Sequence, residues 1–297
     1  VDERMCYTDV KNILEDTDEE AKKRYKALIP MFFMMKELSE ILRNSRHHRG
    51  SIDFDFPESK IILNAAGKAI DVKPYEANVA TKIIEDFMLM ANETVAQEYC
   101  TEEIPFVYRT HDNPDPEKVE SLLTLLHNQG VKIQKAKEEI TPKEIQQIIE
   151  SIEGLPNEAM ISRLVLRSMK QAKYTVECSG HFGLACQYYC HFTSPIRRYP
   201  DLQIHRIIKD ELRGRMSEER TNHYSQILPE VAKQCSTKER RADEAERETD
   251  KLKKAQYMQE RIGETFDGVI SGITGWGIYV ELPNTVEGLI HIATLPD

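Results

Sequence analysis

The sequence predicts an α+β fold of helices and antiparallel strands, followed by the start of a small β-barrel. Apolar residues recur at helical spacing through most of residues 1–261. Short stretches in which apolar and polar residues alternate, bounded by turn residues, interrupt these helices. A β-branched, aromatic and glycine-rich segment then follows residue 263, and such a composition is typical of barrel strands.

The amino-terminal third is predicted to be mainly helical, with one small sheet. Residues 7–14 and 19–42 carry apolar residues at helical spacing, so we expect a short helix and a long helix there. Residues 51–56 alternate apolar and polar side chains, and two further short apolar segments follow turn signals at 60–63 and 69–72. This pattern predicts a small antiparallel sheet.

The middle of the chain is predicted to be helical again, with isolated strands. Helical periodicity returns over residues 76–99, and a charge-rich helical pattern extends over residues 218–261. Glycine and proline residues separate the shorter elements between these two segments. The shorter helices are expected at 116–127, 142–152, 157–170 and 200–213, and the strands at 106–109 and 173–177.

Composition limits the possible functions. The chain has 297 residues, of which 40% are hydrophobic, so it can build a core. Its net charge of −10 and pI of about 5.5 argue against a surface that binds nucleic acid everywhere, so any RNA site is expected to be a local basic patch or channel. Six cysteines without paired spacing, no apolar run of transmembrane length and no signal-peptide pattern predict a reduced, cytoplasmic compartment and no membrane partner.

A zinc site is an alternative that the cysteines suggest. Cys178, His181, Cys186 and Cys190 lie close together in the sequence. The intervening residues 182–185 are typical of a packed core segment rather than of a zinc knuckle. We therefore interpret the thiols as small, buried, apolar groups.

Residues 191–206 concentrate positive charge at a predicted helix start. Thr193 or Ser194 can cap this helix, and the proline that follows suits its first position. Arg197 and Arg198 then lie in the first turn, where the helix dipole disfavours cations. Two guanidiniums beside free backbone N–H groups favour an anion such as a nucleotide phosphate. An Asp or Glu of the chain itself is the alternative partner, and the sequence leaves both open.

The same motif resembles a known family. Residues 192–201, Phe-Thr-Ser-Pro-Ile-Arg-Arg-Tyr-Pro-Asp, preceded by His-Phe-Gly-Leu-Ala at 181–185, resemble the signature of the RNB (ribonuclease II) exoribonucleases, and within them the ribonuclease R group. Segments at 4–10, 84–92 and 245–248 extend the resemblance. It implies a processive, magnesium-dependent hydrolase of RNA degradation. Such an enzyme acts as a monomer on single-stranded RNA, shortens it from the 3′ end and releases nucleoside 5′-monophosphates.

The resemblance implies roles for individual residues. Arg197 is expected to contact the scissile phosphate and stabilise the charge that develops there in the transition state, and Glu246 is expected near the active centre. Tyr7 and Glu85 are expected at the 3′ end of the RNA, where they read the ribose 2′-hydroxyl that distinguishes RNA from DNA. Further RNA contacts are expected from Phe54, Asn92, Ser194, Arg198, Trp276 and Tyr279, and secondary ones from Tyr199, Asp201 and Arg206.

Several of these residues also have a simpler interpretation. Glu246 lies in a highly charged predicted helix, so it can be a solvated ion-pair partner. Glu85 can cap or pair locally, and Phe54 can belong to the core of the small sheet. Glu85 and Asn92 are seven residues apart on one predicted helix, so both can project from the same face into a channel.

The end of the chain resembles a second family. Residues 265–282 and 286–292 resemble the first strands of the S1-type OB-fold, an RNA-binding barrel. Trp276, Tyr279 and Phe266 are where stacking on bases is expected, at about 1–3 kcal/mol per base, although Phe266 can equally lie in the barrel core. The sequence ends short of a closed barrel, so we expect unpaired strand edges.

One feature departs from the RNB pattern. The family holds its magnesium with aspartates spaced as Asp, five residues, Asp, one residue, Asp-Asp. That spacing is absent, since neither Asp16-Thr-Asp18 nor Asp53-Phe-Asp55 provides it. We therefore expect a carboxy-terminal portion of such an enzyme, inactive alone and without metal ligands of its own. It would combine an incomplete RNB catalytic domain over 1–261 with a truncated OB-fold over 262–297.

Two other interpretations stay open at this point. The chain can be a non-catalytic RNA-binding protein that uses the RNB scaffold, in which Arg197 and the OB-like end hold RNA without cutting it. It can also be a structural helical protein whose arginine pair serves only an internal ion-pair network.

Overall fold

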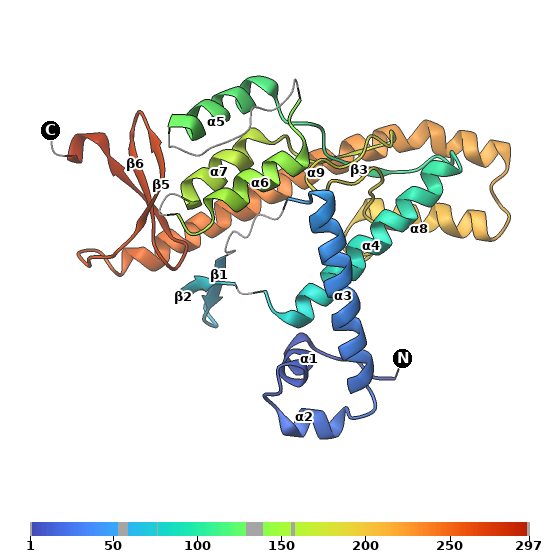
Figure 1. The fold of residues 1–297 in the computed structure, drawn as a ribbon, viewed down its shortest axis with the longest axis horizontal. Helices are drawn as coiled ribbons and strands as arrows, with labels where there is room; N and C mark the ends of the chain where they lie inside the picture. Colours follow the sequence, from blue (N-terminus) through green and yellow to red (C-terminus); the bar gives the residue numbers. More distant parts are fainter. Residues whose placement is uncertain (1, 53–58, 76, 129–138, 156–157, 296–297) are drawn as a thin grey trace. The chain divides into compact units, whose positions relative to one another are not determined.

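The computed structural model describes residues 2–52, 59–75, 77–128, 139–155 and 158–295. The chain forms two compact units, each built from three separate stretches of sequence, and the ribbon in Figure 1 shows their helices and strands. Unit 1 comprises residues 1–52, 77–112 and 171–236, and unit 2 comprises residues 53–76, 113–170 and 237–297. All the paired strands of the described residues run antiparallel, so the α+β class predicted from the sequence is confirmed.

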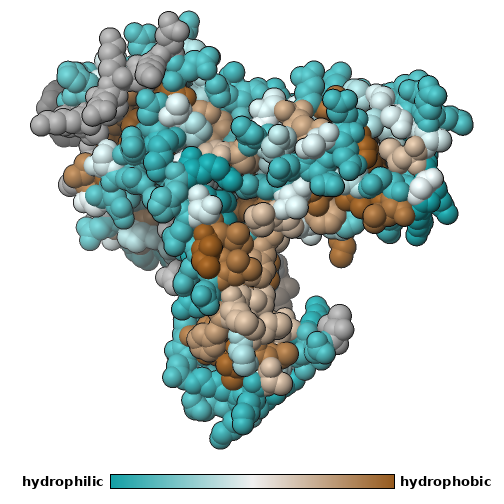
Figure 2. Space-filling view, turned by 45° about the vertical axis from the view of Figure 1, so that its right-hand side comes forward, coloured by the Kyte–Doolittle hydropathy of each residue, from teal (hydrophilic) through white to brown (hydrophobic). Residues whose placement is uncertain are grey.

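Helices make up most of unit 1. They are α1 (Tyr7–Leu14), α2 (Glu19–Arg24), α3 (Ile29–Arg49), α4 (Val79–Thr101), α8 (Tyr199–Leu212) and the first part of α9 (Glu218–Gln259). α3 lies alongside α4, and α1 packs against both, as Figure 1 shows. Apolar side chains gather on the surface of this helical region in Figure 2. The exposed apolar residues of α3 include Met31, Met34, Leu38 and Ile41.

The single long helix predicted over residues 19–42 is wrong, because the structure has two helices there. α2 ends at Arg24, and a turn follows in which the Leu28 N–H donates to the Tyr25 carbonyl at 2.8 Å. α3 then begins with Pro30 in its first turn. Proline lacks the N–H that would continue an existing helix but fits the first turn of a new one, so Pro30 explains the break.

A small sheet and a hydrophobic core support the segment that carries the arginine pair. β3 (Tyr108–Thr110) pairs with β4 (Lys173–Thr175) in unit 1. Fully buried residues of α4, of the loop before β3, of α8 and of α9 pack around this sheet; they include Ala96, Phe106, Ile204, Ile207 and Leu228. Since Ile204 and Ile207 belong to this core, α8 is firmly held, and the segment that precedes it is attached to a rigid element.

Unit 2 contains two antiparallel sheets and a group of helices. β1 (Ser59–Leu63) pairs with β2 (Ala69–Pro74), and β5 (Val269–Thr274), β6 (Gly277–Glu281) and β7 (Glu287–His291) form a three-stranded meander. A short 3-10 helix, η1 (Ile292–Thr294), follows β7. The helices are α5 (Pro116–Asn128), α6 (Pro142–Ile152), α7 (Glu158–Ser168) and the second part of α9. The helices in the described ranges are all too short or too polar to cross a membrane.

Most other predicted elements are present; α1 and α6 have the predicted ends, and the others have shifted ends. The helices expected at 76–99, 116–127, 142–152 and 157–170 correspond to α4, α5, α6 and α7, and the expected barrel strands correspond to β5, β6 and β7. Most of the strand expected at 51–56 falls on residues 53–56, which lie outside the described residues, as does Phe54. The predicted division of the chain at residue 261 stays a prediction.

Candidate nucleic-acid interface

The arginine pair lies in a turn before α8 and not in the first turn of that helix. The backbone N–H groups of Arg197 and Arg198 both donate to the Ser194 carbonyl, at 3.3 and 3.1 Å. α8 begins at Tyr199, without a side-chain cap, and carries Pro200 in its first turn. The predicted helix start, with Thr193 or Ser194 as cap and Pro195 in the first position, is therefore wrong. Two prolines fit a helix start here, and the structure uses the second.

Arg198 has a partner inside the protein. Its Nη2 donates to Asp201 Oδ1 at 2.8 Å, and the Ser194 N–H donates to the same oxygen at 2.7 Å. Asp201 is fully buried, with 0% of its surface exposed. The intramolecular acid that the sequence left open is therefore present, and it engages Arg198. This ion pair argues against the predicted RNA contact of Arg198.

Arg197 has the opposite environment. Its side chain is exposed, and it makes no hydrogen bond or ion pair with any of the described residues. The neighbouring Ile196 is fully exposed and Tyr199 is 49% exposed, so the turn projects from the surface of unit 1. The guanidinium of Arg197 is therefore available to an external anion, while that of Arg198 is not.

Asn92 of α4 holds the segment that leads into this turn. Its Oδ1 accepts the Phe192 N–H at 3.0 Å, its Nδ2 donates to the Tyr189 hydroxyl at 3.2 Å, and its carbonyl accepts the Cys190 thiol at 3.3 Å. Because Asn92 is only 3% exposed and its polar atoms are occupied, this arrangement argues against the predicted RNA contact. Glu85, by contrast, is exposed on α4. The two residues do not share the predicted face, since the segment 189–192 covers Asn92.

His205 of α8 holds the same segment from the other side. Its Nε2 lies 3.0 Å from the Phe192 carbonyl, and its ring stacks on the Phe192 ring with 4.5 Å between centroids. The peptide groups before and after Phe192 are thus bound by side chains of two different helices. This explains how a stretch without regular secondary structure can place the turn in a defined position.

Buried aromatic and histidine rings underlie the segment. His181 contacts Tyr189, Tyr189 contacts His191, and the Tyr174 hydroxyl lies 2.8 Å from His191 Nδ1. Burial lowers the pKa of His181 to about 3 and, together with the nearby Arg198, lowers the pKa of His191 to about 2. Both rings are therefore neutral at pH 7 and serve as packing groups with one hydrogen-bonding edge.

The cysteines of this region are packing groups as well. Cys190 is buried, and Cys178 and Cys186 are half-buried. Burial raises the pKa of the thiols of Cys178 and Cys186 to about 12. Neutral, partly or fully buried thiols agree with the interpretation given from the sequence.

Glu85 and Tyr7 lie on neighbouring helices. Tyr7 is the first residue of α1 and is 51% exposed, and α1 packs against α4, which carries Glu85. The exposure of both side chains agrees with contact to a ligand, and Glu85 also interacts with other residues of the chain. Their predicted contact with the 3′ end of RNA stays a prediction.

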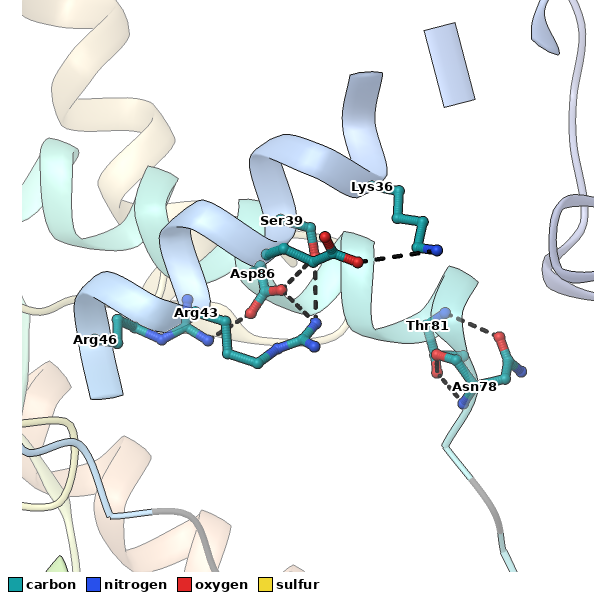
Figure 3. A network of polar contacts seen from close by, with 8 residues as sticks. Lys36, Ser39, Arg43, Arg46, Asn78, Thr81 and Asp86 are labelled. Atoms are coloured by element: carbon teal, nitrogen blue, oxygen red, sulfur yellow. Dashed lines mark hydrogen bonds and ion pairs between the residues drawn. The ribbon is translucent and has the colours of Figure 1, made fainter. Parts of the chain in front are cut away.

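A buried ion-pair network fixes the helix that carries Glu85. Asp86 is 1% exposed and accepts hydrogen bonds from Ser39, Arg43 and Arg46 of α3, the Arg43 bond measuring 2.7 Å. Figure 3 shows these side chains converging on the carboxylate between the two helices. Burial alone would raise the pKa of Asp86, but the hydrogen bonds from Ser39 and the two arginines outweigh it and hold the pKa below its usual value.

Sequence reasoning missed Asp86 and His205, and it misread Asn92. Asp86 and Asn92 occupy positions on the buried face of α4, which also contains Ala80, Ile83 and Ala96. A polar residue at an apolar position of a helix usually has a specific buried partner. The placement of Asp86 and Asn92 among the apolar positions of this helix is therefore the sequence feature that could have predicted a structural role for both residues.

Glu246 and the predicted stacking residues Trp276, Tyr279 and Phe266 lie in unit 2. Glu246 is an exposed residue of α9, so the structure gives it no role beyond a solvated carboxylate. Trp276 is 71% exposed at the β5–β6 turn, and Phe266 is 41% exposed, so Phe266 is not a core residue of the sheet. Tyr279 and Phe266 line one hollow of unit 2 together with Arg247, Lys251 and Lys254. Asp250, Glu281 and Glu287 line the same hollow, so it combines aromatic, cationic and acidic groups.

No cluster of described residues fits a magnesium ion. The described residues contain no group of three or more His, Cys, Asp or Glu side chains that could hold a metal ion. Asp18 caps α2 and Asp16 pairs with Lys22, so these two acids already have partners. Asp53 and Asp55 lie outside the described residues.

Comparisons with known proteins show which families the chain resembles. Residues 1–214 match the RNB domain family, and residues 259–297 match the S1 RNA binding domain family. Ribonuclease R 1 of Lactococcus lactis is 41% identical over 293 residues, which cover 99% of this chain and 36% of that protein. Ribonuclease R of Aquifex aeolicus is 47% identical over 282 residues, which cover 94% of this chain and 39% of that protein.

A solved structure has the same fold over nearly the whole chain. Mycoplasma genitalium RNase R in complex with ribose methylated single-stranded RNA matches with a TM-score of 0.90 at 29% identity, and the match covers 98% of this chain and 46% of that chain. The chain thus spans less than half the length of each of these relatives.

Proposed function

The chain belongs to the RNB domain family and carries an S1 RNA binding domain match at its end, and we propose that it is part of a processive 3′-to-5′ exoribonuclease of the ribonuclease R type. The complete protein hydrolyses single-stranded RNA to nucleoside 5′-monophosphates, depends on magnesium and acts in the cytoplasm. Support comes from the ribonuclease R relatives and from the RNA complex of the M. genitalium protein.

The exposed guanidinium of Arg197 is the observation that carries this proposal. A phosphodiester is an anion with two free oxygens, and a guanidinium can bind both oxygens at once. The turn that carries Arg197 is bound to α4 through Asn92 and to α8 through Asp201, so the guanidinium is presented from a fixed backbone. In this position Arg197 orients the scissile phosphate and stabilises the charge that develops on it during hydrolysis.

The other residues of the chain bind and orient the RNA. Tyr7 and Glu85 hydrogen-bond the ribose 2′-hydroxyl at the 3′ end, Trp276 and Tyr279 stack on bases, and Glu246 lies near the active centre. Magnesium supplies the activation of the attacking water when it is bound. Since the aspartate spacing of the family is absent from the sequence and no set of described residues fits the ion, we propose that this chain does not supply the metal ligands.

A binding comparison tests the proposed substrate. The chain should bind a fluorescently labelled single-stranded oligoribonucleotide more tightly than the DNA of the same sequence, as measured by fluorescence anisotropy at low salt. Glu85→Gln should weaken RNA binding and leave DNA binding unchanged, whereas Glu98→Gln, an exposed residue of the same helix, should alter neither. Equal affinity of the unmodified chain for RNA and DNA would count against the assigned ribose contact.

A hydrolysis assay tests the assignment of the metal ligands. We predict that the 297-residue chain does not shorten single-stranded RNA in the presence of magnesium, because its sequence lacks the family's aspartate spacing, which would hold the ion that generates the attacking hydroxide. The measurement is chromatography of nucleoside monophosphates against a reaction without protein. Release of monophosphates above that background would refute the assignment.

A non-catalytic RNA-binding protein on the RNB scaffold is the second candidate. The absence of the family's aspartate spacing from the sequence favours it, because Arg197 and the S1-type end suffice to hold RNA. The complete natural protein separates the two candidates. Magnesium-dependent release of monophosphates by that protein supports the exoribonuclease, and RNA binding without any release supports the binding protein.

A further inference from the structure

A single buried carboxylate lies behind the turn that presents Arg197. Asp201 has 0% of its surface exposed, and it lies in the first turn of α8. We propose that Asp201 is a positioning residue, which sets the place of the Arg197 guanidinium for binding an RNA phosphate without touching the RNA itself. This inference rests on the proposed function, because it assumes that Arg197 binds a phosphate.

The hydrogen bonds of Asp201 reach both ends of the turn. Its Oδ1 accepts the Ser194 N–H at 2.7 Å and the Arg198 Nη2 at 2.8 Å. The Ser194 carbonyl in turn accepts the N–H groups of Arg197 and Arg198. One carboxylate oxygen thus closes the loop between residues 194 and 198. Of the two arginines in this loop, Arg198 is bound to Asp201, and the Arg197 side chain is exposed to solvent.

The turn is also tied to a rigid support. Asp201 and His205 are four residues apart, so they project from the same face of α8, and His205 binds the Phe192 carbonyl. Ile204 and Ile207 of the same helix are fully buried in the core of unit 1. A shift of the turn would therefore require either a shift of α8 or the loss of the Asp201 hydrogen bonds. Losing these bonds requires less free energy than moving a helix that is packed in the core.

Stability alone is a poor explanation for this carboxylate. Asp201 Oδ2 is buried and has no hydrogen-bond partner among the described residues, and the same holds for Arg198 Nε and the Thr193 hydroxyl. A buried charge whose polar atoms are only partly paired stabilises a fold less than apolar groups of similar size do. The geometry that Asp201 imposes on residues 194–198 is the more direct reason for its place.

A double-mutant cycle tests the proposal in the intact chain. The variants are Asp201→Asn, Arg197→Ala and the two combined, and the readout is affinity for a single-stranded oligoribonucleotide by fluorescence anisotropy. Asn keeps the size of Asp and one acceptor oxygen, so it is the least disruptive change. Asp210→Asn is the matched control, because Asp210 is also an α8 carboxylate bound to an arginine, Arg220, but lies at the other end of the helix.

We expect Asp201→Asn to weaken RNA binding about tenfold and to have no further effect once Arg197 is alanine. Asp210→Asn should leave the affinity unchanged. An equal loss with and without the Arg197 side chain would overturn the proposal, because Asp201 would then act independently of Arg197. A folded Asp201→Asn variant with unchanged affinity would overturn it as well.

Two further readouts keep the test decisive. If thermal unfolding shows that Asp201→Asn is not folded, Arg198→Lys replaces it. Lysine keeps the charge but not the guanidinium geometry, so a weaker loss that also vanishes with Arg197→Ala is expected, and unchanged affinity contradicts the proposal. If Arg197→Ala alone leaves the affinity unchanged, the phosphate contact of the proposed function is contradicted. That outcome differs from the one in which Arg197→Ala weakens binding but the effect of Asp201→Asn does not depend on the Arg197 side chain.

Discussion

At the scale of single residues, Arg197 and Arg198 are neighbours with opposite environments. Asp201 engages Arg198, while the Arg197 side chain is exposed. The sequence predicted a positively charged turn and two possible partners, an external phosphate and an internal acid. The sequence could not show which arginine binds which partner, because an acid three or four residues away can contact either arginine. The conformation of the turn at residues 194–198 determines which arginine contacts the internal acid. That conformation depends on which of the two prolines lies in the first turn of the helix.

The first prediction concerns the buried carboxylate of Asp86. Asp86→Asn should lower the free energy of unfolding by about 3 kcal/mol, because it leaves two partly buried arginines without their charged partner. Glu40→Gln is the control, since the exposed Glu40 pairs with Lys36 at a distance of 3.9 Å, and should change stability by less than about 0.5 kcal/mol. Urea unfolding followed by circular dichroism measures both. Equal effects of the two variants would contradict a structural role for Asp86.

The second prediction concerns the pH dependence of stability. His181 and His191 have pKa values lowered to about 3 and about 2 by burial, whereas an unfolded histidine has a pKa of about 6.5. Their contribution is complete above pH 6.5 and is lost as the pH falls, because the unfolded chain takes up protons that the folded chain excludes. Each histidine should lower stability by about 1.4 kcal/mol between pH 7.5 and pH 5.5.

A variant isolates the contribution of one ring. His191→Phe should be less sensitive to pH over this range than the unmodified chain, because it lacks one of the two groups that titrate on unfolding. Urea unfolding at pH 7.5 and 5.5 measures the difference. An unchanged pH dependence in the variant would show that folding does not lower the pKa of His191.

At the scale of elements, periodicity predicted most helices and strands, but the ends of only a few of them, such as α1 and α6. α4 to α7 and β5 to β7 were expected where they are found. The break between α2 and α3 was missed, because the apolar spacing continues across it. The ends of elements depend on caps and on proline positions, and several sequence positions are often compatible with these.

The third prediction concerns Gly277 at the start of β6. Its φ is +146°, and a Cβ there would lie 2.1 Å from the Ile290 carbonyl oxygen of the paired strand. Gly277→Ala should therefore separate β6 from β7 and cost about 3 kcal/mol or more. Gly275→Ala, two residues away in open space, should cost less than about 0.5 kcal/mol. Hydrogen exchange of the β7 amides measures the pairing, and similar protection in both variants would contradict this account.

At the scale of the whole molecule, the two units interleave along the sequence. Each unit is assembled from three separate stretches, and α9 contributes to both. Local patterns cannot reveal this division, because it depends on contacts between residues far apart in the sequence. The family was nevertheless accessible from the sequence, since the motif at residues 192–201 is long and specific, and residues 1–214 match the RNB domain family.

The phosphate contact of Arg197 underlies the proposed function, and the salt dependence of RNA affinity measures that contact. The slope of log K against log salt concentration should be shallower than about −3 for the unmodified chain, and Arg197→Ala should reduce its magnitude by about 0.7, because one counterion fewer is released from the single strand. Arg213→Ala removes the same charge from an exposed position at the other end of α8 and should change neither slope nor affinity. If Arg197→Ala leaves both the slope and the affinity unchanged, the phosphate contact is absent and the nuclease interpretation loses its basis in the structure.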